Sequence, residues 1–128
     1  MGVFSVKAVI WNPLNPSRKS ELELLVDTGS TYTVLPTGLL RRLGVDSMRV
    51  VRLRLADGRV TERPLGEVGI EIEGIKATAT PAVFGEGDTS LLGSVTMEQL
   101  GLAPDPIEKR LKTVEALLMT VRTKEQLL

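Results

Sequence analysis

The sequence reads LLVDTGS from Leu24 to Ser30, so an acidic turn directly follows a run of apolar residues. Polar and apolar residues alternate just before it, and the pattern predicts a strand over residues 21–26 that runs from an exposed edge into the core. A carboxylate delivered to the interior is unfavourable unless a partner or a function compensates for its burial. Asp27 is therefore the leading candidate for chemistry, although the same string is also a common turn in which Asp and Ser satisfy a tight loop.

Short segments with alternating hydrophobicity on both sides of this stretch predict further strands. They lie at Phe4–Trp11, Arg49–Leu55, Val68–Ile72 and Ala77–Phe84, and a second apolar run extends from Thr33 to Leu35. Two short helices are predicted, one over Thr37–Gly44 with Thr37 as its N-cap, and one that starts at a capping box of Thr96 and Gln99. We therefore expect a mainly β, largely antiparallel domain with one or two short helices.

Turn-forming residues mark the connections between these elements. Asn12–Ser17 contains two prolines and two asparagines and predicts a long loop. Asp57-Gly58 predicts the tight turn of a hairpin. After a break at Pro104–Pro106, the tail from Ile107 to Val121 fits helical spacing, but Thr113–Val121 also fits a strand, so both alternatives stay open.

The composition limits the chemistry that the chain can perform. Its 128 residues suit one domain, so residues 1–128 are expected to fold around a single core. The 16 basic and 16 acidic residues cancel, which argues against a nucleic-acid partner bound by charge. The chain has no Cys and no His, which excludes disulfides, Cys–His and Ser–His–Asp nucleophiles and the usual zinc sites. Catalysis must then rest on carboxylates, hydroxyls, Lys, Arg or backbone amides, and neither a cofactor nor a metal is expected.

No segment predicts export or membrane insertion. Residues 1–11 have no basic residue ahead of a hydrophobic stretch, and no run of about 18 apolar residues occurs anywhere. We therefore expect a cytoplasmic protein without a membrane partner.

Three motifs in a fixed order give the chain a family resemblance. They are Leu25–Ser30, the hairpin Ala56–Arg59 and the hydrophobic-hydrophobic-Gly string Leu91–Gly93. With them the sequence resembles the retropepsin-like (clan AA) single-domain aspartic proteases, and it is most similar to small bacterial and archaeal cytosolic members and to the protease domain of eukaryotic ubiquitin-shuttle proteins. The matched core spans about residues 21–105, and the tail at 107–128 lies outside it.

The resemblance implies a closed, barrel-like antiparallel fold and a specific use of the Asp27 turn. In this family two Asp carboxylates face each other, share a proton and hold the attacking water, one as base and the other as acid. The chain has a single Asp-Thr-Gly string, so two copies of Asp27 are needed and a homodimer is expected. Thr28 would brace the two loops across the dimer, Gly29 would allow close backbone approach, and the Ser30 hydroxyl would favour the ionised form of Asp27.

The other two motifs acquire roles through the same resemblance. The hairpin is expected to be the flap that closes over an extended peptide; its residues are Ala56, Asp57, Gly58, Arg59 and Val60. Leu91, Leu92 and Gly93 are expected to pack beneath the catalytic loop. Arg59 and Glu62 make this flap polar, in contrast to the Tyr and Ile clusters of better-known relatives.

The predicted function is that of an aspartic endopeptidase acting on peptides or unfolded proteins. The alternative is a catalytically silent dimer of the same fold that binds peptides or serves assembly. A phosphate site like that of the actin and sugar-kinase superfamily is disfavoured because that fold needs two large α/β domains. A divalent cation between two copies of Asp27 would find too few ligands in one short loop.

Candidates for the subsites that select substrate side chains are Leu35, Leu53, Val60 and Val83.

Overall fold

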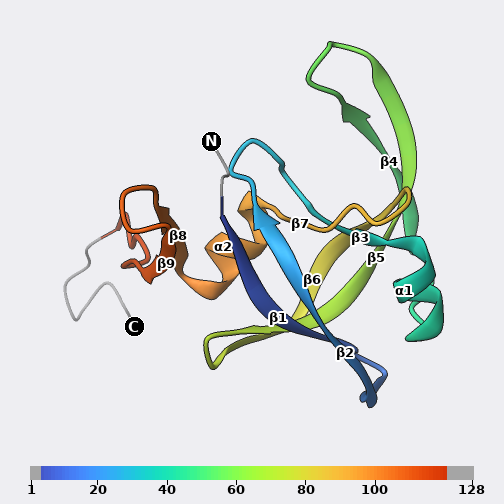
Figure 1. Ribbon diagram of the computed structural model, residues 1–128, viewed down its shortest axis with the longest axis horizontal. Helices are drawn as coiled ribbons and strands as arrows, with labels where there is room; N and C mark the ends of the chain where they lie inside the picture. The colour runs from blue at the N-terminus through green and yellow to red at the C-terminus, as the bar shows by residue number, and fades with distance from the viewer. Residues whose placement is uncertain (1–3, 121–128) are drawn as a thin grey trace.

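Six strands close into a ring in the computed structural model of the protein, which describes residues 4–120 (Figure 1). The main sheet runs in the order β1-β2-β7-β3-β6-β5-β4, and β5 also pairs with β1. The elements are β1 (Ser5–Asn12), β2 (Asn15–Val26), β3 (Thr33–Pro36), α1 (Thr37–Arg42), β4 (Arg49–Arg54), β5 (Val60–Ile72), β6 (Ile75–Gly85), β7 (Leu91–Leu92), α2 (Ser94–Leu100), β8 (Leu102–Asp105) and β9 (Arg110–Thr113). The predicted mainly β fold with short helices is confirmed.

The ring is mainly antiparallel, as predicted, but it contains two parallel pairs that the sequence did not indicate. β2 pairs in parallel with β7, and β3 pairs in parallel with β6. Long connections rather than tight turns join these partners, as parallel pairing requires. β7 has two residues, Leu91 and Leu92, and is too short for its hydrophobic pattern to reveal a strand. It nevertheless joins β2 to β3 and so links the two halves of the ring.

The predicted long loop at Asn12–Ser17 is wrong. A two-residue turn, Pro13-Leu14, connects β1 to β2. The Asn12 side chain holds this turn, because its Oδ1 accepts the Leu14 N–H at 2.8 Å. Pro16 is tolerated inside β2 because it lies where the β1–β2 register shifts, between the pairs Asn12–Asn15 and Trp11–Lys19, so no regular ladder bond from its nitrogen is required.

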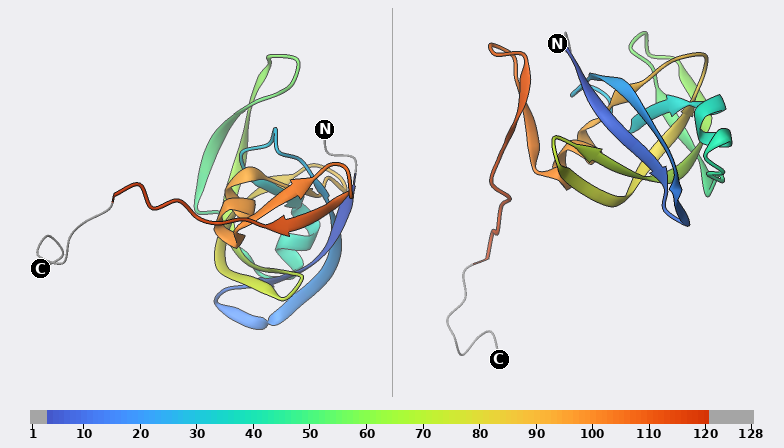
Figure 2. Two further views of the ribbon diagram at one scale, coloured as in Figure 1. Left: turned by 90° about the vertical axis from the view of Figure 1, so that its left-hand side faces the viewer. Right: turned by 60° about the horizontal axis from the view of Figure 1, so that its bottom comes forward.

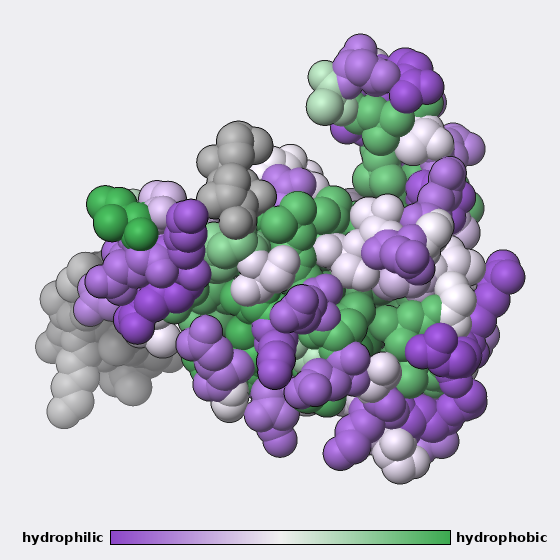
Figure 3. Space-filling model, in the orientation of Figure 1, coloured by the Kyte–Doolittle hydropathy of each residue, from purple (hydrophilic) through white to green (hydrophobic). Residues whose placement is uncertain are grey.

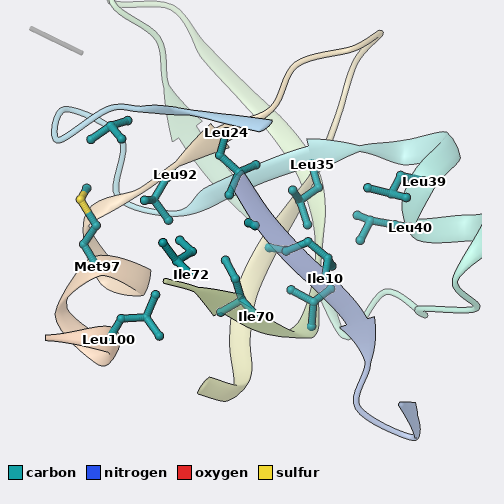
Figure 4. Packing of buried hydrophobic residues seen from close by; sticks show 14 of the residues in the cluster. Ile10, Leu24, Leu35, Leu39, Leu40, Ile70, Ile72, Leu92, Met97 and Leu100 are labelled. Atoms are coloured by element: carbon teal, nitrogen blue, oxygen red, sulfur yellow. The ribbon is translucent and has the colours of Figure 1, made fainter. Parts of the chain in front are cut away.

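The main core lies inside the ring (Figure 4). Its largest fully buried apolar side chains are Ile10, Leu24, Leu35, Leu40, Ile70, Ile72 and Leu92. Burial of each such side chain stabilises the fold by about 1.5–3 kcal/mol. A second, smaller cluster contains Val51, Leu65 and Val83, with Tyr32, Val34 and Leu53 packed against it. Because Val51 belongs to β4, this second cluster attaches the β4–β5 hairpin to the ring.

Both helices begin differently from the prediction. Thr37 is the first residue of α1 rather than its N-cap, and its hydroxyl donates to the carbonyl oxygen of Gly85 at 2.8 Å. Thr96 lies within α2 and is fully buried, so it forms no capping box with Gln99. The predicted stop of α1 is confirmed, because Gly44 has a φ of 77°, which favours glycine.

The tail holds a hairpin that the sequence did not predict. β8 and β9 form a separate two-stranded sheet that follows α2. Pro104 and Asp105 belong to β8, so the predicted break is wrong at these two residues. The two alternatives for the tail, a helix or a strand over Thr113–Val121, are not found in the part of the tail that the structure describes. Residues 114–120 continue away from the ring without regular structure (Figure 2), and Val121 lies outside the described residues.

Asp105 fixes the connection between β8 and β9. Its Oδ1 accepts the N–H groups of Ile107 at 3.0 Å and Glu108 at 3.1 Å. These bonds favour the carboxylate, and the Glu108 N–H is the main cause that lowers the pKa of Asp105 below its ordinary value.

Candidate active site

Asp27 stands at the end of β2, where the chain leaves the ring. Its N–H donates to the carbonyl oxygen of Leu92 at 3.0 Å, so β7 holds the start of the loop. The prediction that the strand delivers Asp27 to the interior needs correction. Leu24 and Val26 are buried, but Leu25 is exposed and Asp27 is half-buried, because strand side chains alternate between the two faces. Asp27 therefore meets solvent in the single chain.

The Asp27 carboxylate is held by two donors from its own loop. The Gly29 N–H donates to Oδ1 at 3.0 Å, and the Ser30 hydroxyl donates to Oδ2 at 2.9 Å. A Cβ atom on Gly29 would lie 3.3 Å from Oδ1, so a side chain there would crowd the carboxylate. The exposed Thr28 lies between Asp27 and these donors in the chain. Both carboxylate oxygens thus have fixed positions, and each keeps a lone pair for a further partner.

The start of α2 is bonded to the same loop. The N–H groups of Ser94 and Val95 donate to the carbonyl oxygens of Ser30 at 2.8 Å and Thr31 at 3.0 Å. These bonds satisfy first-turn amides that a side-chain cap would otherwise serve, which explains why the predicted capping box is not needed. Gly93 is the contact point, since a Cβ atom there would lie 2.3 Å from the carbonyl carbon of Tyr32. Leu91–Gly93 therefore lies against the loop, and only glycine fits at its last position.

Three buried threonines under the loop form a hydrogen-bonded cluster that the sequence did not reveal. The Thr33 hydroxyl donates to Thr96 Oγ1 at 2.7 Å and accepts the Gly93 N–H at 3.1 Å. The hydroxyls of Thr80 and Thr96 are also hydrogen-bonded, at 2.7 Å. All three threonines are fully buried. They join β3, β6 and α2, which are distant in sequence, so no local pattern could have found them.

The β4–β5 hairpin projects from the ring, and its tip is mostly hydrophilic (Figures 1 and 3). The Leu55 N–H donates to the Arg59 carbonyl oxygen at 2.7 Å and closes the turn. Gly58 has a φ of 89°, which explains the glycine. Asp57 Oδ1 accepts the Arg59 N–H at 3.0 Å, and its Oδ2 lies 2.6 Å from Arg59 Nε. The predicted hairpin is confirmed, with three residues, 56–58, rather than two at its tip.

A cleft of about 930 Å³ lies between this hairpin and the Asp27 loop. The cleft is lined by five of the residues proposed for the site, Gly29, Ser30, Arg59, Val60 and Leu91. Asp27 and Thr28 directly precede this lining in the chain and are not part of it. Ala56, Asp57 and Gly58 lie beyond the cleft at the hairpin tip, and Leu92 and Gly93 lie beneath the loop. Three of the four candidate subsite residues, Leu53, Val60 and Val83, line the cleft. Leu35 does not, because it is fully buried in the main core.

Apolar and basic residues share the cleft wall. Tyr32, Val34, Leu53 and Val83 supply an apolar floor that continues into the second hydrophobic cluster. Arg63 on β5 lies beside this floor, and its Nε donates to the Phe84 carbonyl oxygen at 2.8 Å. An apolar floor with a few fixed polar groups is the usual form of a binding site.

No group of three or more acidic side chains suited to a metal ion occurs within residues 4–120.

Comparison with known proteins agrees with this geometry. Residues 17–96 match the family model described as "Aspartyl protease", which is more than half of the chain. The matched range contains the Asp27 loop, the hairpin and Leu91–Gly93. No curated protein matches the chain.

Proposed function

This chain belongs to the aspartyl protease family, and from that premise we propose that it is an endopeptidase that acts as a homodimer, with one Asp27 from each subunit. The observation that supports this most directly is the Asp27 carboxylate, which is held by Gly29 and Ser30, two residues that line a peptide-sized cleft. Thr28, Gly29 and Ser30 would support the catalytic loop, and Leu91–Gly93 would hold it from beneath.

The proposed reaction needs two carboxylates that share one proton. The ionised Asp27 removes a proton from a water molecule, whose oxygen then attacks the peptide carbonyl carbon, while the protonated Asp27 of the second subunit gives its proton to the carbonyl oxygen. The resulting tetrahedral intermediate then collapses and its C–N bond breaks. The first Asp27 gives the proton that it took from water to the leaving amine, and the second Asp27 regains a proton from a hydroxyl of the intermediate. Two like charges in contact cannot both stay ionised, which is why the pair shares a proton.

Two features support a dimer over a monomer. Asp27 opens the chain's single Asp-Thr-Gly string, so one subunit would supply one catalytic carboxylate. Asp27 is half-buried and Thr28 exposed in the single chain, so both are accessible to a second subunit. The flap residues 56–60 would then close over an extended peptide from each side.

The test is hydrolysis of an unbiased peptide library between pH 3 and pH 8. We expect a bell-shaped pH dependence, because one carboxylate must be ionised and the other protonated. Asp27→Asn should abolish cleavage. Asp46→Asn, which changes an exposed aspartate away from the cleft, is the matched control and should keep full activity. Equal cleavage by wild type and Asp27→Asn would overturn the proposal.

Mixing the two proteins tests the dimer itself. After subunit exchange, an equimolar mixture of wild type and Asp27→Asn should show about half the activity of its wild-type portion, because random pairing leaves half of the wild-type subunits with an inactive partner. Full retention of activity after proven exchange would refute a shared site. A folded dimer that cleaves nothing at any pH would instead favour the alternative, a peptide-binding or assembly module.

Location is a separate matter. No helix within residues 4–120 has the length and hydrophobicity to cross a membrane. A cytoplasmic location is part of the proposal, and cell fractionation tests it.

A further inference from the structure

We propose that the cleft selects peptides with an acidic side chain close to the cleavage site, and that Arg63 in the cleft wall is the residue that binds this carboxylate. The inference rests on the proposed function, and it adds the substrate class. It follows from the charge of the cleft, from the position of Arg63 and from the partners of the neighbouring arginines.

The cleft is basic in a protein without net charge. Four arginines line it, Arg52, Arg54, Arg59 and Arg63, against one acidic residue, Glu86. The whole chain has equal numbers of basic and acidic residues, so this excess of positive charge is local. Such a cleft attracts an acidic peptide and disfavours a basic one.

Arg63 is placed on the face of the hairpin that meets the floor. It lies directly opposite Val51 in the β4–β5 pair, and opposite residues share a face of the sheet. Val51 is buried in the second hydrophobic cluster, so Arg63 extends along the same apolar wall. The side chain of Arg63 is 27% exposed, which leaves its guanidinium accessible but partly shielded from water. Shielding strengthens a charge-assisted hydrogen bond.

The guanidinium of Arg63 is fixed through Nε and has long contacts at its two terminal nitrogens, of which NH2 donates to Thr37 Oγ1 at 3.5 Å. Its Nε donates to the Phe84 carbonyl oxygen at 2.8 Å, which sets the plane of the group. Its NH1 lies 3.5 Å from Glu86 Oε1, and the Glu86 side chain is 83% exposed. An exposed ion pair at this separation contributes little. A substrate carboxylate can therefore replace Glu86 and form the stronger two-pronged contact that arginine offers.

The other three arginines are less suited to this role. Arg59 pairs with Asp57 at the hairpin tip, and Arg54 donates to the Gly58 carbonyl oxygen at 3.1 Å. Arg52 lies opposite Glu62, an acidic residue on the same face of the β4–β5 pair.

A peptide fits the cleft better than a polyphosphate. The floor beside Arg63 is formed by apolar side chains, Tyr32, Val34, Leu53 and Val83. Apart from the Tyr32 hydroxyl, these side chains present apolar surface to a substrate and no donors for a chain of phosphates. A peptide with one carboxylate next to an apolar side chain matches the Arg63 guanidinium and the apolar floor beside it.

The test compares pairs of peptides that differ only in Glu against Gln beside the cleavage site found with the library. Wild type should prefer the Glu peptide in kcat/KM, and Arg63→Gln should reduce that preference about tenfold, as expected for one lost charge-assisted contact. Arg49→Gln is the matched control, since Arg49 is an exposed residue of the same hairpin outside the cleft, and it should leave the preference unchanged. Arg63→Lys should keep part of it.

Glu86→Gln separates recognition from a merely structural role of Arg63. Removal of the competing carboxylate should raise the Glu-over-Gln preference about two- to threefold, which loss of structure would not do. Raising the NaCl concentration should weaken the preference. A preference that is absent, or that survives in Arg63→Gln, overturns the inference while leaving the protease proposal intact.

A binding measurement keeps the inference testable if the protein cleaves nothing. The library is passed over immobilised Asp27→Asn protein and over the double variant Asp27→Asn/Arg63→Gln, and the retained peptides are sequenced by mass spectrometry. Enrichment of acidic peptides on the first protein alone supports the inference. Equal amino-acid composition of the peptides retained by both proteins overturns it. An oligothymidylate is passed over the same proteins as a polyphosphate ligand, and its stronger retention than that of any acidic peptide also overturns the inference.

Discussion

The buried threonine cluster offers the sharpest test of how the candidate site is held. In Thr96→Val, a methyl group replaces the hydroxyl that bonds to Thr33 and Thr80, both at 2.7 Å. The shape of the side chain is nearly unchanged, so the effect reports on hydrogen bonding. We expect the free energy of unfolding to fall by about 3 kcal/mol, from two lost bonds of roughly 1 kcal/mol each and the penalty for leaving a buried hydroxyl without its partner.

Chemical denaturation measures this change, and two variants make the comparison specific. Thr78→Val changes an exposed threonine of the same strand, β6, and should alter stability by less than about 0.5 kcal/mol. Thr96→Ser keeps the hydroxyl and should retain most of the stability. If Thr96→Val lost no more stability than Thr78→Val, the hydrogen bonds of the cluster would contribute nothing net and the reasoning would be refuted.

Two further predictions concern titration. Ser30→Ala removes the hydroxyl that donates to Asp27 Oδ2, so the acid limb of the pH–rate profile should move to higher pH; an unmoved limb would contradict the role given to this hydroxyl. The pKa of Asp105 is lower in the folded chain than its ordinary 3.8, so its contribution to the β8–β9 turn is complete above that value and is lost as the pH falls through the folded pKa. Amide exchange of Ile107 and Glu108 should therefore be faster, after correction for intrinsic rates, below that pH than at pH 6.

The sequence predicted those parts of the fold that have a local pattern. The strand before Asp27, the hairpin at Asp57-Gly58 and the stop of α1 at Gly44 all depend on residues adjacent in the chain, and the structure has each of them. The order of three motifs was enough to indicate the family, because each motif is short and the spacing between them is set by the fold.

The two errors at the helix starts share one physical cause, which is that tertiary partners replaced local ones. Thr37 and Thr96 have the residue type and spacing of helix caps, but the Thr37 hydroxyl bonds to Gly85 and Thr96 is buried against Thr33. The exposure of Asp27 was also misjudged, since an apolar run does not reveal where a strand ends relative to the surface. Arg63 was missed because its importance depends on a strand pairing and on the Phe84 carbonyl group, neither of which has a local signal.

The position of β4 has a consequence for how such an enzyme can diversify. β4 is the strand of the main sheet that lies outside the ring, and it pairs with β5 alone. Stability and recognition are therefore partly divided between different strands: the ring and its core hold the Asp27 loop, while exposed hairpin residues face the cleft. Substitutions at those exposed hairpin positions disturb few buried contacts, so natural selection can alter substrate preference there with little loss of folding stability. If the proposed function holds, a duplicated gene could acquire a new substrate by changes confined to this hairpin, with the Asp27 loop left as it is.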